Sequence, residues 1–457
     1  MLHSKGRCES VETVFPLTTE RPRIAIIGGG IAGCVFAAEL AQDPSLRIDL
    51  YEAGARLGGL HNSPVVGGLA YDIGAFFFEP THQLFKTFPG LAEKFVSFPS
   101  RAVSVGDGGK LDRYPISLNG YIRNQGMAHF LAAMLDLGFG KIRYRRRHTL
   151  PSFMKYYLGS KIYERSGLRH YIERLFGLPD AEVDLRFAEQ RMGVLREWTS
   201  LRHAAGRFFR SPTRFANQPY FSPTVLARPR EGFSAAYAVI EAQLRSAGVE
   251  VYKGAGISSI ANSSGRFQVQ LSDQVREYDL IVSTAPLPVT AKLAGIPVRH
   301  RFETVSLLTL FYRFQGSSSF DGAVLHNFSH GGAWKRIIDF SYIYGDPQGY
   351  FAVEIPVRGT PDIIAQQEQF ELHLAELGLF RNGLHLEGSE LTRNAYPIFR
   401  ARQLGELAAD KQRILDWGII LAGRQGEFEY LSSSQVATVA ALKAGEVRER
   451  FRRAAAG

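Results

Sequence analysis

The chain has 457 residues, of which 45% are hydrophobic and 21% are charged, so it can form large buried cores and is not a disordered chain. Its two cysteines, Cys8 and Cys34, form no CxxC pair, which excludes a disulfide scaffold and a cysteine-ligated zinc site and favours a reducing compartment. The net charge of +10 favours anionic partners, and no apolar run is long enough to predict a transmembrane helix.

Residues 1–20 carry several charged side chains and no continuous apolar stretch. They therefore do not have the pattern of a secretory signal. We expect a short N-terminal extension on a cytoplasmic protein.

The segment after this extension has the pattern of a dinucleotide-binding unit. Residues 23–27 form an isoleucine-rich run typical of a buried parallel strand, and they lead directly into a GxGxxG motif at residues 28–33. Residues 35–40 favour a helix, and residues 48–51 predict a second strand that ends in Glu52. All parts of the fingerprint are present in order, which favours a bound dinucleotide over a chance glycine turn.

Each residue of this motif has a physical role. Gly28 allows the tight turn, Gly30 lets the backbone approach a pyrophosphate, and Gly33 lets the helix pack closely on the strand. Free N–H groups at the helix start, around Ile31 and Ala32, bind the diphosphate. Glu52 accepts hydrogen bonds from ribose hydroxyls.

The next segment indicates which dinucleotide is bound. Residues 52–59, EAGARLGG, resemble the E-x-x-x-R-x-G-G extension of two-domain FAD flavoproteins, which include the amine oxidase and protoporphyrinogen oxidase families. The resemblance implies FAD, with Arg56, Gly58 and Gly59 along its diphosphate. A plain NAD dehydrogenase does not need this segment, and a glycine-rich loop without a ligand is the alternative.

The resemblance continues along the chain, from about residue 23 to residue 450. Residues 69–78 resemble the "fDiGgHxf" segment of UDP-galactopyranose mutase and its protoporphyrinogen-oxidase-like relatives, and residues 110–118 resemble their "yPinl" segment. Residues 228–233 and 278–286 resemble two further segments of the FAD domain. Residues 248–252 predict the strand that contacts the adenosine part of FAD in these families.

The C-terminal third supplies the candidate catalytic residues. Residues 333–337, 395–398 and 421–430 resemble the mutase motifs "tRit", "YPi" and "vGRxGxyrY". By this resemblance Arg336, Arg424, Tyr396 and Tyr430 clamp a substrate diphosphate. A helix that begins near Ser432 and Ser433 would direct its N-terminus at the flavin. The expected cofactor contacts are Gly28, Gly30, Ile31, Ala32, Gly33, Glu52, Ala53, Arg56, Gly58, Gly59, Leu60, Val251, Gly423, Arg424, Ser432 and Ser433.

The sequence also departs from the mutase pattern. Phe76 stands where the mutases have a histidine above the flavin, and Glu429 replaces their second motif arginine. The aromatic-rich segment that lines the mutase substrate site is deleted after Pro179. A serine replaces the flavin-contacting Asp. The FAD site is kept in outline, whereas the uracil- and sugar-binding parts differ.

These patterns predict an α/β fold with a discontinuous Rossmann-type FAD-binding domain of the GR2-like class. We expect this domain to comprise residues 21–85, 225–290 and 405–450. Residues 86–224 should form a mainly helical insert with few turn signals. Residues 291–404 should form a substrate-binding sheet region, because residues 305–312 and 349–355 alternate in the manner of antiparallel strands.

The insert contains two basic clusters, at residues 138–175 and 196–214. Such clusters attract phosphates or anionic membrane surfaces, and a solvated basic face is the alternative. Interleaved aromatic residues favour a peripheral membrane contact. No motif supports nucleic acid as a partner. The expected partner in the site is a small molecule, phosphorylated or nucleotide-linked.

Three functions fit these observations. The first is an FAD-dependent oxidoreductase that acts on a small-molecule or lipid-like substrate by hydride transfer to flavin N5, because the mutase histidine and aromatic segment are missing. The second is a nucleotide-sugar mutase like UDP-galactopyranose mutase, with reduced FAD as the nucleophile. The third is a non-catalytic flavin-binding scaffold.

Each candidate side chain also has a structural interpretation. Arg336 and Arg424 could form ion pairs with Asp339 or Glu427, and the two tyrosines could be half-buried core aromatics. Phe76 would be an apolar wall. The histidines, among them His61, His148, His203 and His326, have no metal-ligand spacing, so we expect no metal site.

Overall fold

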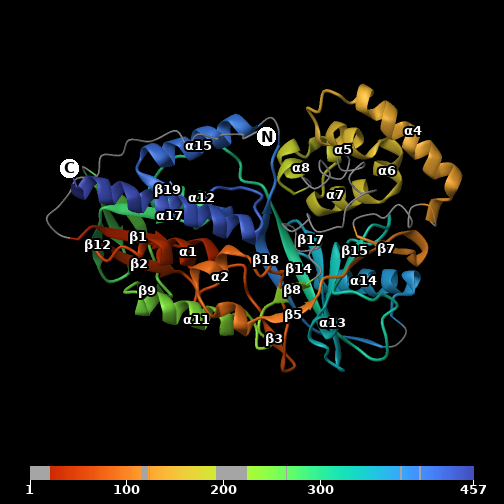
Figure 1. The fold of residues 1–457 in the computed structure, drawn as a ribbon, viewed down its shortest axis with the longest axis horizontal. Coiled ribbons are helices and arrows are strands. Elements are labelled where there is room, and N and C mark those ends of the chain that lie inside the picture. The colour runs from red at the N-terminus through yellow and green to blue at the C-terminus, as the bar shows by residue number, and fades with distance from the viewer. Residues whose placement is uncertain are drawn as a thin grey trace, which may run out of the picture.

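A computed structural model describes residues 21–114, 122, 124–191, 224–263, 265–380, 383–400 and 403–456. Figure 1 shows two lobes side by side, one built on a parallel sheet and the other on a large antiparallel sheet. The expected N-terminal extension, the arginine cluster at residues 196–214 and part of the segment at 110–118 lie outside the described residues. Within the described ranges, no helix has both the length and the apolar character needed to cross a bilayer.

The first lobe contains a five-stranded parallel sheet in the order β19-β13-β1-β2-β9. Its strands come from three separate stretches of the chain, and their apolar side chains are buried on both faces, as expected for a parallel sheet. The strands are β1 (Arg23–Ile27), β2 (Arg47–Glu52), β9 (Glu250–Lys253), β13 (Leu280–Ser283) and β19 (Ile419–Leu421). The predicted α/β fold with a Rossmann-type domain is confirmed.

Helices α1 (Ile31–Leu40), α11 (Phe233–Ser246) and α17 (Ser433–Ala456) share one apolar core with this sheet. Helix α12 (Leu287–Leu293) follows β13, and α15 (Leu404–Asp416) precedes β19. The short α16 (Gly423–Gly426) follows β19 and leads toward α17. A separate antiparallel meander connects β9 to β13. It consists of β10 (Ser259–Ser263), β11 (Arg266–Gln270) and β12 (Val275–Tyr278).

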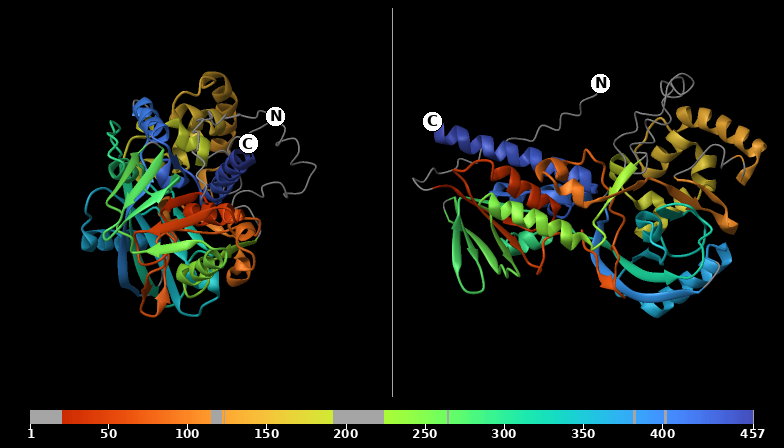
Figure 2. Two further views of the ribbon diagram at one scale, coloured as in Figure 1. Left: turned by 90° about the vertical axis from the view of Figure 1, so that its left-hand side faces the viewer. Right: turned by 60° about the horizontal axis from the view of Figure 1, so that its bottom comes forward.

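The second lobe contains a seven-stranded sheet in the order β18-β14-β17-β16-β15-β6-β7, which is strongly curved (Figure 2). All neighbouring strands are antiparallel except β15 and β6. The strands are β6 (Ala102–Val105), β7 (Leu111–Arg113), β14 (Thr304–Phe314), β15 (Val324–Asn327), β16 (Arg336–Asp339), β17 (Gly349–Val357) and β18 (Leu384–Pro397). Helices α13 (Phe340–Tyr344) and α14 (Ile363–Leu377) accompany them. Strands β14 and β17 contain the two alternating runs read from the sequence, so the antiparallel pairing is confirmed.

The insert is helical from residue 127 to residue 191, and Figure 1 shows these helices grouped at one end of the second lobe. They are α4 (Met127–Arg143), α5 (Leu150–Leu158), α6 (Ser160–Arg165), α7 (Leu168–Phe176) and α8 (Leu185–Arg191). The segment expected to be mainly helical nevertheless contains strands β5 (Val96–Pro99), β6 and β7 in its first part. Strand β5 pairs with β8 (Thr224–Ala227), and β6 pairs with the distant β15. Such short strands depend on remote partners, so the local sequence does not reveal them.

Candidate functional site

The glycine motif forms a close-packed turn between β1 and α1. Gly28 has a φ of +105°, a region that side chains disfavour, and its N–H donates to the carbonyl oxygen of Tyr51 at 2.7 Å. A Cβ added at Gly33 would lie 1.9 Å from the carbonyl oxygen of Gly28, so only glycine allows α1 to pack this closely on β1. Around Gly30, by contrast, the nearest atom to such a Cβ is the Cα of Gly59 at 3.9 Å. The space beside Gly30 is therefore open to a ligand that approaches the backbone closely.

Helix α1 begins next to this opening. Its N-cap is Gly30, which provides no side-chain hydrogen bond to the first turn. The first N–H groups of a helix have no partner within the helix, and the helix dipole makes this end electropositive. Ile31, Ala32 and Gly33 form that first turn, so the expected diphosphate contacts lie together at one helix end.

Glu52 lies at the end of β2, beside the glycine turn. Its carboxylate accepts hydrogen bonds from the N–H of Gly29 and the N–H of Gly54, both at 2.7 Å. These bonds hold the acid at the carboxyl end of the sheet, where α/β folds bind their ligands. The uncapped start of α1 and the glycine backbone fit the diphosphate of FAD, and the fixed carboxylate of Glu52 fits its ribose.

The other expected cofactor contacts surround the same edge of the sheet. Ala53, Arg56 and Gly59 are exposed, Gly58 is buried and Leu60 is half-buried. Val251 is buried on β9, where it pairs with Leu50 on β2. A Cβ added at Gly423 would lie 2.7 Å from the Cβ of Ala32, so α16 approaches the first turn of α1 closely.

The start of α17 lies near this region as well. The Ser432 side chain accepts from the N–H of Gln435 at 3.3 Å, and the Gln435 side chain accepts from the N–H of Ser432 at 2.8 Å. This reciprocal arrangement is a capping box, and Ser433 is the first helical residue. The helix start expected near residue 432 is observed there.

The four candidate catalytic residues lie in one cluster, in which the tyrosines are buried and the arginines are half-buried. The rings of Tyr396 and Tyr430 stack with their centroids 5.5 Å apart. The guanidinium of Arg424 lies 4.6 Å from the ring centroid of Tyr396 and donates to the carbonyl oxygen of Ala395 at 2.5 Å. Arg336 joins the cluster through Glu354, which also binds Lys335. The tyrosine hydroxyl of residue 396 accepts a hydrogen bond from the Lys335 ammonium at 2.8 Å.

Two members of this cluster, Lys335 and Glu354, were missed by the sequence analysis. Glu354 is fully buried on β17, directly opposite Arg336 on β16. One of its carboxylate oxygens accepts from the Lys335 ammonium at 2.9 Å, and the other accepts from the Arg336 guanidinium at 2.6 Å. A signal was present, because Glu354 is the one acid within the otherwise uncharged strand GYFAVEIPV. An acid in such a strand needs a buried cation.

The charges around Tyr396 alter its acidity. Burial by itself would raise the pKa of its phenol. The Glu354 carboxylate also acts to raise this pKa. The positive charges of Lys335, Arg336 and Arg424 act in the opposite direction, and the net result is a pKa of about 8. Tyr396 is therefore a phenol that exchanges its proton near neutral pH, which suits an acid–base group.

The alternative roles weighed for the arginines differ in detail from those observed. Arg336 forms an ion pair, but its partner is Glu354 and not Asp339 or Glu427. Asp339 instead caps α13 through the N–H of Tyr342, and Glu427 pairs with Lys443 at 2.7 Å. Tyr396 and Tyr430 are buried in the core and not half-buried, with exposed fractions of 7% and 1%.

Phe76 packs within a group of aromatic rings. Phe76 contacts Phe233 edge to face, with centroids 5.6 Å apart, and His61 at 4.9 Å. The backbone N–H of the preceding Ala75 donates to Glu354 at 3.1 Å, which connects the loop carrying Phe76 to the buried cluster. The cluster therefore lies directly beneath the loop that resembles the flavin-covering loop of the mutases.

The histidines do not form a metal site in the described part of the chain, where no group of three or more His, Cys, Asp or Glu side chains could hold an ion. His61 and His326 are buried, and His148 is exposed. Burial, and to a lesser extent His82, lowers the pKa of His61 to about 3. His203 lies outside the described residues.

Comparison with known proteins identifies relatives of the nucleotide-binding segment. Residues 26–89 match the NAD(P)-binding Rossmann-like domain family. Tryptophan 2-monooxygenase of Agrobacterium vitis is 39% identical over 69 residues, which are 14% of this chain and only 9% of that enzyme. The match therefore spans a small part of the curated relative.

Two solved structures match nearly the whole chain. The structure of reduced UDP-galactopyranose mutase has a TM-score of 0.73 and 16% identity, with 94% of each chain covered. A protein assigned as a protoporphyrinogen oxidase from Exiguobacterium sp. 255-15 has a TM-score of 0.71 and 17% identity, with 95% of this chain and 100% of the other covered. The chain therefore shares its fold with these two structures, whose names are those of two families that the sequence motifs resemble.

Proposed function

We propose that the protein binds FAD at the carboxyl edge of its parallel sheet and is an oxidoreductase acting on a small-molecule or lipid-like substrate. The observation that carries this proposal is the buried cluster of Lys335, Glu354 and Tyr396 beneath the loop of Phe76. Its tyrosine has a lowered pKa, and its carboxylate, Glu354, also pairs with Arg336. An acid–base group beside a flavin site suits oxidation of a substrate that must also lose a proton.

The residues of the first lobe would hold the cofactor. The first turn of α1 offers N–H groups to the diphosphate, and Glu52 offers its carboxylate to the ribose. Gly58 and Gly59, the second glycine pair, lie against Gly30 with no side chain in between. FAD supplies a two-electron acceptor when it is bound there.

The chain's own contribution to the chemistry is a proton acceptor. With a pKa of about 8, Tyr396 is partly ionised at neutral pH, and the Lys335 ammonium stabilises its phenolate through their hydrogen bond. The phenolate would accept the proton that an alcohol or amine loses on oxidation. Tyr396 is only 7% exposed, so bulk water has little access to this exchange.

A nucleotide-sugar mutase is the second candidate. Its support is the convergence of Arg424, Tyr396 and Tyr430, three of the residues expected to clamp a diphosphate. The ion pair of Arg336 with the fully buried Glu354 weighs against it, because a paired guanidinium has less charge to offer a diphosphate. We therefore rank net oxidation first.

Anaerobic reduction tests the proposal. The protein loaded with FAD is mixed with amines, alcohols and unsaturated fatty acids, and loss of the oxidised flavin absorbance is followed. We expect at least one class to reduce the flavin, and Tyr396→Phe to slow that reduction while Tyr342→Phe does not. If FAD binds but none of these substrates and no chemical reductant alters its spectrum, the non-catalytic scaffold replaces the enzyme.

A further inference from the structure

Helix α4 exposes a stripe of large apolar side chains. Met127, Leu131, Leu135, Phe139 and Ile142, the α4 stripe, have exposed fractions between 56% and 78%. Their spacing of three or four residues places them on one side of the helix. A helix of 17 residues is about 25 Å long, so the stripe is an extended surface and not one isolated side chain.

The opposite side of α4 is packed, which fixes the orientation of the stripe. Ala133 and Gly140 are buried, and a Cβ at Gly140 would lie 3.0 Å from the carbonyl oxygen of Lys155 on α5. Asp136, the only acid in the helix, accepts from the N–H of Lys161 on α6 at 2.9 Å. The acid therefore faces the neighbouring helices, and the exposed side carries no negative charge.

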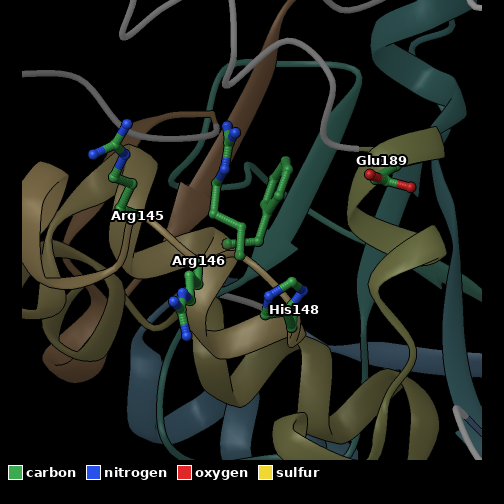
Figure 3. A pocket seen from close by; sticks show the side chains of 6 residues that line it. Arg145, Arg146, His148 and Glu189 are labelled. Atoms are coloured by element: carbon green, nitrogen blue, oxygen red, sulfur yellow. The ribbon is translucent and has the colours of Figure 1, made fainter.

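A basic cluster lies where the stripe ends. Arg143, Arg145 and Arg146 follow Ile142 and are exposed. Arg145 and Arg146 lie at a pocket of about 570 Å³. Figure 3 shows Arg145, Arg146 and His148 among the side chains that line it, with Glu189 on another helix. In the part of the chain that the structure describes, neither Arg145 nor Arg146 forms an ion pair, whereas Arg147 donates to the hydroxyl of Tyr157 at 2.8 Å.

We propose that α4 docks the protein onto an anionic phospholipid bilayer. The α4 stripe enters the boundary between headgroups and acyl chains, and Arg143, Arg145 and Arg146 contact lipid phosphates. This combination of an acid-free apolar face with adjacent arginines is the pattern of interfacial helices. Charge complementarity favours an anionic bilayer over a second copy of the chain. The same face of a second copy has no acidic side chain that could pair with these arginines.

The docked surface is linked to the site by the same helical insert. Phe176 on α7 and Phe187 on α8 contact the ring of Tyr430, with centroids 5.9 and 5.1 Å apart. The insert thus forms a wall of the buried cluster on one side and carries the α4 stripe on another. Docking would hold the site near the bilayer, yet the inference itself does not depend on the proposed reaction.

Vesicle co-sedimentation of the full chain tests this surface. The probes are vesicles of phosphatidylcholine alone and vesicles containing one third phosphatidylglycerol. We expect binding at least tenfold tighter to the anionic vesicles, and a loss of tenfold or more for Leu135→Glu. Ile364→Glu, on α14, is the matched control, because Ile364 is an apolar side chain exposed to 69% elsewhere. It should bind as the unchanged protein does.

A second variant, Arg145→Glu with Arg146→Glu, separates the two contributions. Under the proposal it weakens binding to anionic vesicles and leaves the weak binding to phosphatidylcholine unchanged. Binding that needs the arginines but tolerates Leu135→Glu would indicate a general polyanion site and overturn the proposal. Absence of vesicle binding would also overturn it, and so would a dimer in sedimentation velocity that Leu135→Glu dissociates. Thermal unfolding of each variant verifies that it is folded.

Discussion

The hydroxyl of Tyr396 lies 2.8 Å from the ammonium nitrogen of Lys335, although both side chains are almost completely buried. Such a pair is costly to bury unless its charge is balanced. Glu354 offsets part of the positive charge, since it binds Lys335 with one oxygen and Arg336 with the other. The result is a phenol held among three cations and one carboxylate.

The first prediction concerns the titration of Tyr396. Burial alone would raise its pKa, but the surrounding cations lower it to about 8. Tyrosinate absorbance should therefore rise near pH 8, before the bulk of the tyrosines ionise. Tyr396→Phe should remove this early step, and Lys335→Met should shift it to higher pH. Tyr342→Phe is the control, because burial raises the pKa of Tyr342 and its loss should leave the step in place.

The second prediction concerns Glu354→Gln. This change removes the carboxylate from between two buried cations, so it should lower the free energy of unfolding by about 3–5 kcal/mol. Because Glu354 also opposes ionisation of Tyr396, its loss should move the tyrosinate step below pH 8. Urea denaturation and absorbance titration measure the two effects. Glu368→Gln, at an exposed position on α14, should change neither, and equal stability of both variants would contradict the account.

The third prediction separates cofactor binding from folding. An alanine at Gly30 fits the apoprotein, since the nearest atom lies 3.9 Å from the added Cβ, but the methyl group fills the space for a diphosphate. Gly30→Ala should leave thermal unfolding of the apoprotein unchanged and weaken FAD binding at least tenfold. Gly138→Ala on α4, where nothing lies within 4 Å, should leave FAD binding unchanged and should not destabilise the apoprotein, because alanine favours a helix more than glycine does. Undiminished FAD affinity in Gly30→Ala would place the cofactor elsewhere.

The fourth prediction concerns stability in acid. Burial and His82 lower the pKa of His61 to about 3, so the unfolded chain binds a proton at His61 below pH 6.5 while the folded chain does not. The folded state should then lose about 1.4 kcal/mol per pH unit as the pH falls from 6.5 toward 3. His61→Phe should flatten the measured slope by about that amount. His385→Gln, whose side chain is 77% exposed, should keep the slope, and an unchanged slope in His61→Phe would refute the assignment.

The dinucleotide-binding edge was accessible from sequence because its parts are contiguous. The strand, glycines, helix and acid of residues 23–52 follow one another, and each has a local physical requirement such as the missing Cβ at Gly33. The antiparallel sheet was also accessible, since the long alternating runs of β14 and β17 signal its strands. Cofactor contacts at individual residues stay predictions.

The buried cluster was only partly accessible. The motif resemblance named Arg336, Arg424, Tyr396 and Tyr430, which the fold brings together. It did not name Glu354 or Lys335, because their roles depend on the cross-strand pairing of residues 336 and 354. The exposure of the α4 stripe was likewise hidden, because the apolar side of an amphipathic helix normally packs against the core. Only the fold shows that Ala133 and Gly140 face inward on α4 instead.

The most direct test of the proposed function is an absorbance titration of the FAD-loaded protein with UDP, before and after anaerobic reduction. Arg336 is paired with Glu354, so we predict stoichiometric FAD binding and flavin bands that UDP leaves unchanged. Failure to bind FAD would contradict the cofactor assignment. A saturable shift with UDP would show that the diphosphate clamp is functional, and it would replace net oxidation with the nucleotide-sugar mutase.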